Sequence, residues 1–331
     1  MSLLRNTELC WRKGSIMDTG TAKELKYTGR IGQTFIFLGK MFRMFILQND
    51  WKVLPMAAVI AAMVSMAIGA GLFASMEGTL QGSFALTCVC IWNGFFNSIQ
   101  SICRERAVVK REHRAGMHIT SYVAAHLIYQ LFLCTMQVII TIYVCSRTGV
   151  KYPEADKTVF LVKLFITLLL ITYAADILAL MVSAIVRTPM TAMTVMPFLL
   201  IVQLVFAGFF SLPASLNEVS DLMISKWGVR GLCVMSDYNS LPAVVIWNKM
   251  YSSGDKIDLV NGVNLKDVLK IVEEKGQRDE VLKKLGEANR NPDYENTPEN
   301  LVKCWKYLFS YTIVFAAVTV VFLEFVDRDK R

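Results

Sequence analysis

The sequence predicts an all-α membrane protein. Its apolar composition, its long uncharged runs and the distribution of its basic residues all indicate this fold class. Of the 331 residues, 54% are hydrophobic, although the formal net charge is +8. A soluble domain of this composition would expose a large apolar surface to water. A helix needs about 20 apolar residues to cross the hydrocarbon core of a bilayer. Runs of that length without Asp, Glu, Lys or Arg occupy 53–76, 78–103, 119–146 and 188–217.

Two further runs are predicted to span despite an interruption or a shorter length. Residues 164–186 are interrupted only by Asp176, and residues 307–323 are bounded by Trp305 and Glu324. Tryptophan is typical of membrane interfaces. Six transmembrane helices are therefore expected, five within 52–213 and the sixth, with a basic tail, within 304–331.

The basic residues of the short loops predict the orientation of these helices. With both termini inside, the inner segments hold many more Lys and Arg residues than the short outer loops. Cytoplasmic loops carry such an excess. We expect a multi-pass protein of the cell membrane with both termini cytoplasmic and with residues 214–303 as a long extracytoplasmic loop. Anionic membrane lipids account for the positive charge, so nucleic acid is not an expected partner.

The chain before the first span divides into two parts. Residues 1–30 are polar and aperiodic, which predicts a flexible lead. Residues 31–51 contain "GQTFIFLGKMFRMFILQND", in which apolar side chains recur at helical spacing and Lys40 and Arg43 belong to the polar part. This pattern predicts an amphipathic helix that lies in the inner interface rather than crossing the membrane. Its apolar positions are Phe35, Leu38, Phe42, Phe45 and Ile46.

The inner connection between the second and third spans, "CRERAVVKREHRAG" (103–116), carries five basic and two acidic residues. Its composition favours a helix that stops at Gly116. Glu105 and Glu112 are two helical turns apart and share one face. Such a helix could be an elbow at the level of the lipid headgroups, or it could dock a cytoplasmic partner.

Within the outer loop, residues 264–301 predict two short charged helices that are broken at Gly276 and end at Asn291-Pro292. We interpret them as a small outer cap, although their charges would equally suit a solvated face. Cys233 and Cys304 both fall outside in this topology and could form a disulfide, but spacing alone cannot establish that they are close. No CxxC pair occurs, so no metal site is expected.

Two stretches resemble the membrane half of G-type (ABCG/PDR-like, type 2 ABC permease) ATP-binding-cassette exporters. One is "RERAVVKREHRAGMHITSYVAAHLI", with two glutamates seven residues apart, Gly116 after them and Ser-Tyr at the start of the next span. The other is "MPFLLIVQLVFAGFFSLPASL" (196–216), which is similar to the fifth span of that family. The order of the predicted parts also matches over residues 30–326.

The resemblance implies an exporter that moves a hydrophobic or amphipathic substrate outward by alternating access. Two permease halves would form it, expected here as a homodimer, although a heterodimer would use the same spans. A nucleotide-binding subunit would supply the energy. The sequence has no G-x-x-x-x-G-K-[ST] loop, so the chain is not expected to be an enzyme or to hold a cofactor. ATP and Mg are expected in the partner ATPase, which is another chain or a domain outside this sequence.

The family resemblance also implies roles for individual residues. The inner connection (103–116) and the amphipathic helix predicted over 31–51, which corresponds to the connecting helix of that family, would transmit movement from the ATPase. Glu112 would pair with Lys40 or Arg43. A substrate cavity on the two-fold axis would be closed by an outer gate, although aromatic residues in spans also commonly pack against helices or lipid. The coupling residues are Glu105, Glu112, Arg111, Lys40 and Arg43; the cavity residues are Trp92, Asn93, Phe96, Ile201, Leu204 and Val205; and the gate residues are Phe209 and Phe210.

Asp176 is the one acidic residue within a predicted span, and His126 lies at a comparable depth in the third span. We expect these two side chains to interact, which would keep either from facing lipid unpaired. A proton or cation pathway is the alternative.

Two other functions stay open. A permease for a lipid-linked glycan would need a larger polar channel, and a sensory membrane scaffold would need no ATPase. A membrane-embedded enzyme is disfavoured, because the sequence has no HExxH motif and no paired intramembrane carboxylates.

Overall fold

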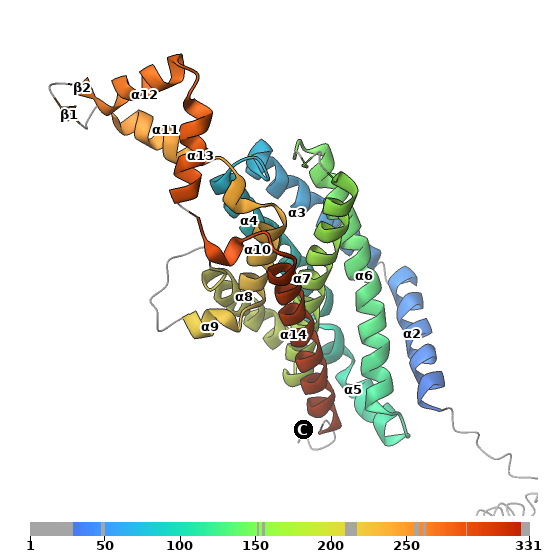
Figure 1. The fold of residues 1–331 in the computed structure, drawn as a ribbon. Helices are drawn as coiled ribbons and strands as arrows, with labels where there is room; N and C mark the ends of the chain where they lie inside the picture. Colours follow the sequence, from blue (N-terminus) through green and yellow to red (C-terminus); the bar gives the residue numbers. More distant parts are fainter. Residues whose placement is uncertain are drawn as a thin grey trace, which may run out of the picture.

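The computed structural model shows a helical bundle with a small cap of helices at one end (Figure 1). It describes residues 29–47, 50–150, 152–153, 156–208, 217–254, 258–260, 263–288 and 290–325. The described chain is nearly all helical, as predicted. Its strands are β1 (Asp258–Val260) and β2 (Val263–Asn264), which pair antiparallel at the far end of the cap.

Three helices are both long enough and apolar enough to cross a membrane. They are α6 (Ile119–Arg147), α7 (Lys157–Ile185) and α14 (Pro298–Glu324). The last begins at Pro298 rather than at 304, because Thr297 caps its first turn. These three helices confirm the expectation of a membrane protein, and the other predicted spans correspond to helices that are shorter or less apolar.

The other apolar helices are shorter or more polar than the uncharged runs suggest. α3 (Val53–Ile68) and α8 (Pro189–Val205) have 16 and 17 residues. At 1.5 Å per residue they are about 24–26 Å long. α3 stops early because Gly69 adopts a φ of 62°. α4 (Met76–Ser98) is 23 residues long but less apolar.

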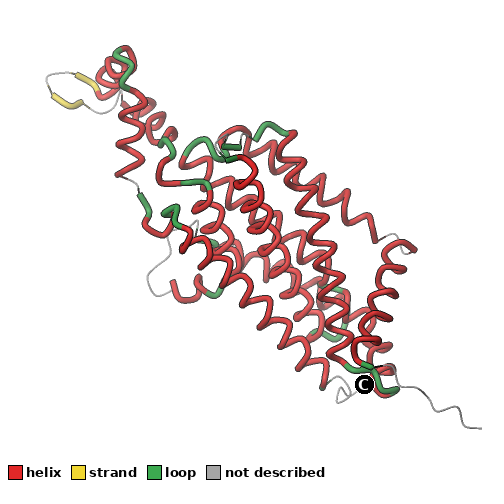
Figure 2. Tube along the Cα trace, turned by 45° about the vertical axis from the view of Figure 1, so that its right-hand side comes forward, coloured by secondary structure: helices red, strands yellow, loops and turns green. Residues whose placement is uncertain are grey.

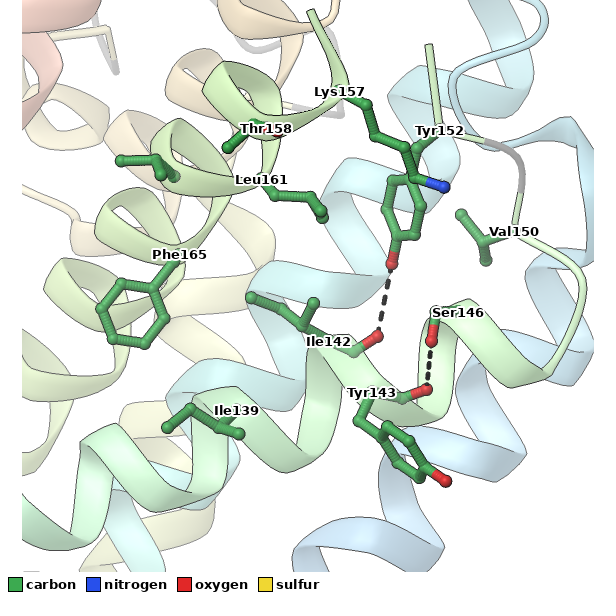
Figure 3. A pocket seen from close by; sticks show the side chains of 11 residues that line it. Ile139, Ile142, Tyr143, Ser146, Val150, Tyr152, Lys157, Thr158, Leu161 and Phe165 are labelled. Carbon is green, nitrogen blue, oxygen red and sulfur yellow. Dashed lines mark hydrogen bonds between the residues drawn. The ribbon is translucent and has the colours of Figure 1, made fainter. Parts of the chain in front are cut away.

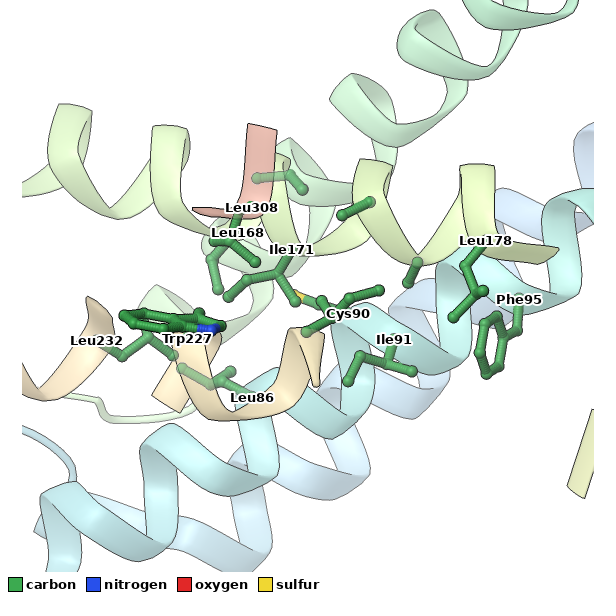
Figure 4. Packing of buried hydrophobic residues seen from close by; sticks show 14 of the residues in the cluster. Leu86, Cys90, Ile91, Phe95, Leu168, Ile171, Leu178, Trp227, Leu232 and Leu308 are labelled. Carbon is green, nitrogen blue, oxygen red and sulfur yellow. The ribbon is translucent and has the colours of Figure 1, made fainter. Parts of the chain in front are cut away.

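The core of the bundle forms around α7, which packs against α4 and α14 along most of its length. Figure 4 shows Ile171 and Leu178 of α7 lying against Ile91 and Phe95 of α4. The two helices approach closely at Gly94, where an added Cβ would lie 2.5 Å from the carbonyl oxygen of Thr172. A glycine at this position lets the two backbones meet.

The predicted outer loop contains a helix that belongs to the core. In α10 (Ile224–Met235), the side chains of Val229, Leu232 and Cys233 are fully buried among α4, α7 and α14. Trp227 stacks on Tyr307 of α14 with ring centroids 3.9 Å apart. Residues 214–303 are therefore not a loop throughout, because the apolar face of α10 removes it from water.

Cys233 and Cys304 are both buried on neighbouring helices, and both are free thiols. Burial raises the pKa of the Cys233 thiol to about 12. The possible disulfide between these residues is therefore not formed.

The short helix α9 (Asn217–Asp221) packs against α10. The cap is built by α11 (Val244–Ser253), α12 (Leu265–Glu274) and α13 (Arg278–Ala288). α12 and α13 confirm the two predicted charged helices, and Gly276 between them has a φ of 68°. Figures 1 and 2 show α11–α13 at the end of the molecule opposite to α5 and the end of α14.

The opposite end of the bundle contains α2 (Arg30–Leu47) and α5 (Ser101–Arg114). We call it the inner end, after the orientation predicted from the sequence. α2 packs lengthwise along the first half of α6, where Phe37 meets Tyr122 edge to face with centroids 5.6 Å apart. Other large apolar side chains of α2, among them Phe35 and Ile46, are exposed. α2 therefore has one face for the bundle and one that suits lipid. The predicted apolar positions are divided between these two faces.

α5 confirms the helix and the stop predicted for 103–116. Beyond its end, the amide of Met117 donates to the carbonyl of Glu112, and the amide of Gly116 donates to that of His113. With Gly116 at a φ of 99°, these bonds form a Schellman motif.

Candidate functional site

The amphipathic helix α2 and the charged helix α5, which we call the elbow, are joined by an ion pair. Lys40 Nζ of α2 lies 3.3 Å from Glu105 Oε2 of α5. Glu112 was expected to pair with Lys40 or Arg43, but the carboxylate that Lys40 meets is that of Glu105. Glu105 and Glu112 share a face, but seven residues place Glu112 about 10 Å further along the helix axis. Arg43 and Arg111 are exposed on the same two helices.

The elbow is also joined to the inner end of α7, because each helix caps the other. Ser183 Oγ accepts hydrogen bonds from the amides of Ile102 and Cys103, both at 3.1 Å. In return, Arg106 Nη1 donates to the carbonyl oxygens of Ala184 at 2.7 Å and Val186 at 3.2 Å. Helix ends leave such amides and carbonyls without partners inside the helix. The two caps therefore fix α5 to α7.

A buried polar network joins three helices in the middle of the bundle. Asp176 of α7 is fully buried and accepts hydrogen bonds from Ser98 of α4 and from Cys134 Sγ of α6, the latter at 3.1 Å. Beside it, the amides of Asn97 and Gln137 exchange two hydrogen bonds of 2.9 Å. A network in which these groups find partners specifies how the helices pack.

His126 does not take part in this network, so the expected His126–Asp176 interaction was wrong. Its ring packs edge to face against Tyr122 with centroids 4.6 Å apart. Neither ring nitrogen has a hydrogen-bond partner among the described residues. Similar depth did not bring the two side chains together, because His126 faces α2 and the start of α5, whereas Asp176 faces α4.

The predicted cavity residues separate into an exposed group and a buried one. Trp92 and Phe96 of α4 stack with centroids 5.9 Å apart. Together with Ile201 and Val205 of α8 they are 39–57% exposed, and Leu204 is half-buried. Asn93 is only 5% exposed and faces the core, so it does not share their surface. The predicted gate residues, Phe209 and Phe210, lie outside the described residues.

A wide groove elsewhere in the bundle does not contain any of these residues. It is an open groove of about 1000 Å³ between the second half of α6 and the first half of α7. Figure 3 shows its apolar walls, among them Ile139, Leu161 and Phe165, with Lys157 at the rim. The hydroxyl of Tyr152 closes one side by donating to the carbonyl of Ile142 at 3.4 Å.

Sequence reasoning missed several residues of this site. Arg106 and Ser183 act on backbone groups of a helix about 80 residues away in sequence, and no spacing rule indicates that. Ser98 and Gln137 did carry a signal, because each is a polar residue inside an uncharged run.

These features first identify the general class of protein to which the chain belongs. Apolar helices of membrane-spanning length, a buried polar network and an amphipathic inner helix tied to a charged elbow describe a helical membrane protein with its polar contacts held inside. Residues 33–235 match the family of the ABC-2 type transporter. The match covers more than half of the chain, which therefore belongs to this family and is a permease component of an ABC transporter. No curated protein gives a significant match to the sequence.

Proposed function

We propose that the chain is the permease half of an ATP-driven exporter of the G type, and that it moves a hydrophobic or amphipathic molecule outward by alternating access. The observation that carries the proposal is the joined inner end, where the Lys40–Glu105 pair links α2 to α5 and the reciprocal caps link α5 to α7. A displacement applied to α5 from the cytoplasm would reach α7 through short polar contacts, without flexible chain between them.

The proposal includes partners that the family implies. An ATPase subunit would bind ATP and Mg and would press on α2 and α5, where Arg43, Arg111 and Glu112 are available beside the Lys40–Glu105 pair. The chain itself would hold no cofactor. It would cross the cell membrane six times with both termini cytoplasmic, α3, α4 and α8 serving as the additional spans.

A second permease half, most simply another copy of this chain, would cover the exposed side chains of α4 and α8. Trp92, Phe96, Ile201 and Val205 present a large apolar surface on a single chain. In a dimer this surface would face the two-fold axis and contact the substrate, with Phe209 and Phe210 as the gate at its outer end. Aromatic faces of this kind bind apolar ligands by contact area.

The test begins with the chain in its own membrane. We expect a tagged chain, extracted in mild detergent, to co-purify with an ATPase subunit. Glu105→Gln should lower substrate-stimulated ATP hydrolysis about two- to fivefold, which corresponds to the modest energy of a partly exposed ion pair. The exchange of charges, Lys40→Glu with Glu105→Lys, should restore most of the activity.

The matched control is Glu280→Gln in the cap, where Glu280 forms an exposed pair with Lys284 at 3.1 Å. It should leave hydrolysis unchanged. Extraction that keeps other transporter complexes intact but yields this chain without any ATPase would contradict the exporter and favour the sensory scaffold.

A further inference from the structure

The groove between the second half of α6 and the first half of α7 changes in polarity along its length. Near the end of α6 and the start of α7 its lining includes the polar side chains of Ser146 and Lys157. Further along both helices the lining consists of apolar side chains, among them Ile139, Leu161 and Phe165 (Figure 3). We call this space the α6–α7 groove.

The change in polarity matches one leaflet of a membrane. α7 has 29 residues and is about 43 Å long, which is close to the thickness of a bilayer together with its headgroups. Its first residue, Lys157, therefore lies at the level of the headgroups. Leu161 is about 6 Å further along the axis, where the hydrocarbon begins, and Phe165 is about 6 Å deeper still. The α6–α7 groove thus runs from the headgroups into the hydrocarbon.

The groove is preformed and is accessible from the lipid. One wall is held in place by Tyr152, whose ring meets those of Phe73 and Phe160 with centroids 6.2 and 6.1 Å apart. Two of the lining side chains, Ile139 and Val162, are 49% and 53% exposed. An apolar space does not hold water well. A lipid acyl chain is therefore the occupant that suits the deeper part of the groove.

The mouth of the groove is positively charged. Lys157 is the one charged side chain among the described residues that line it. This lysine is exposed and, within the part of the chain that the structure describes, forms no ion pair, not even with the preceding Asp156. Arg147 at the end of α6 adds a second positive charge, with its guanidinium 5.4 Å from the ring centroid of Tyr143. A phosphate group complements such charges.

We propose that the α6–α7 groove binds one phospholipid whose headgroup has a net negative charge. Its phosphate would lie beside Lys157, and one acyl chain would lie against Ile139, Leu161 and Phe165. A zwitterionic headgroup would bring its own cation near Lys157 and would bind less tightly. This site goes beyond the proposed function, because the groove contains none of the side chains proposed to contact the exported molecule.

The test uses the full chain in phosphatidylcholine nanodiscs that contain a small fraction of a photoreactive lipid. Two such lipids carry the same diazirine-bearing acyl chain, one with a phosphatidylglycerol and one with a phosphatidylcholine headgroup. After illumination, mass spectrometry should locate the label near Ile139, Leu161 and Phe165. The phosphatidylglycerol probe should label these positions about fivefold more strongly, as expected for one exposed ion pair. Glycerol 3-phosphate in solution should not reduce the labelling.

Variants of Lys157 test the contact with the headgroup. Lys157→Gln should remove the preference, so that both probes label equally, and Lys157→Arg should keep it. Lys306→Gln is the matched control, because Lys306 is an exposed lysine of α14 that does not line the groove. It should leave the preference unchanged.

A second pair of variants tests the contact with the acyl chain. Ile139→Trp should reduce the labelling by both probes, because the indole would fill part of the groove. Ile128→Trp is the control, since Ile128 is on the same helix, is 47% exposed and does not line the groove. It should leave the labelling unchanged.

Equal labelling by the two probes, or an undiminished preference in Lys157→Gln, would overturn the proposal. Label spread evenly over exposed apolar side chains such as Phe198 and Phe309, and unaffected by Ile139→Trp, would do the same because it would reflect bulk lipid. Loss of label in the presence of glycerol 3-phosphate would indicate a site for a soluble anion instead of a lipid. These outcomes do not depend on an ATPase, so failure of this site and failure of the exporter hypothesis are distinguishable.

Discussion

At the inner end of the molecule, polar contacts join residues 65 to 81 positions apart, whereas the charged pairs Glu273–Arg278 and Glu280–Lys284 of α12 and α13 join residues five and four positions apart. Contacts of the second kind hold together one helix, or two helices that follow each other directly in the chain, and do not restrain more distant elements. Those of the first kind fix whole helices against one another. The inner end should therefore move as one body, while the cap should tolerate change.

The largest effect on stability and transport is expected at Asp176, the hydrogen-bond acceptor that joins three helices. Asp176→Leu leaves the donors of Ser98 and Cys134 buried without partners, which should destabilise the protein by about 3 kcal/mol and abolish transport. Asp176→Asn keeps an acceptor and should retain most of the stability. Thermal unfolding in detergent separates the two variants. Equal loss in both would indicate that charge, rather than hydrogen bonding, holds the network.

The next effect concerns the close approach of α4 to α7. In Gly94→Ala the new methyl group would meet the carbonyl oxygen of Thr172 at 2.5 Å and the amide nitrogen of Asp176 at 2.8 Å. Forcing the helices apart should cost about 2 kcal/mol and lower the unfolding temperature. Gly39→Ala in α2 is the control, because no atom lies within 4 Å of its added Cβ. A neutral Gly94→Ala would show that the two helices separate readily.

A smaller loss of stability is expected when α5 is released from the end of α7. Arg106→Met removes the hydrogen bonds to the last carbonyls of α7 while it keeps an aliphatic side chain of similar length. We expect a loss of about 1.5 kcal/mol, typical of hydrogen bonds from a charged group, together with weaker coupling of ATP hydrolysis to substrate. Hydrogen exchange at the end of α7 should rise. Unchanged exchange there would mean that Ser183 alone holds the elbow.

The smallest effect is expected in the cap. Lys284→Ala removes an exposed pair with Glu280 and should change stability by less than about 0.5 kcal/mol, with no effect on transport. A steady-state transport assay on the purified complex measures this. Strong impairment would show that the cap is coupled to the bundle and would weaken the contrast between the two ends.

The parts of the fold that depend on neighbouring residues could be predicted from the sequence. The elbow helix and its stop at Gly116 follow from composition and from one glycine, and α12 and α13 follow from their periodicity and from Gly276. Long-range partners could not be predicted in this way. Glu105 rather than Glu112 meets Lys40, because sequence spacing gives the face of a helix but not the level at which another helix crosses it.

α10 shows a second limit. Its residues were assigned to an outer loop because they lie between two spans and near charged segments. The burial of Val229 and Leu232 depends on a space between α4, α7 and α14 that no local pattern reveals. The position of Asp176 within a span could likewise be predicted from the sequence. Its hydrogen-bond partners Ser98 and Cys134 could not, because they lie on other helices.

The length of α7 has a mechanical consequence. Its 29 residues form one unbroken helix. About three turns into the helix, Thr167 accepts a hydrogen bond from the indole of Trp305 at 3.0 Å, and at the far end Ser183 holds α5. A rod of this length extends about 43 Å, so a tilt of roughly 5° about one end would carry the other end about 4 Å sideways. α7 can thus work as a stiff lever, turning a small push at one face of the membrane into a larger sweep at the other.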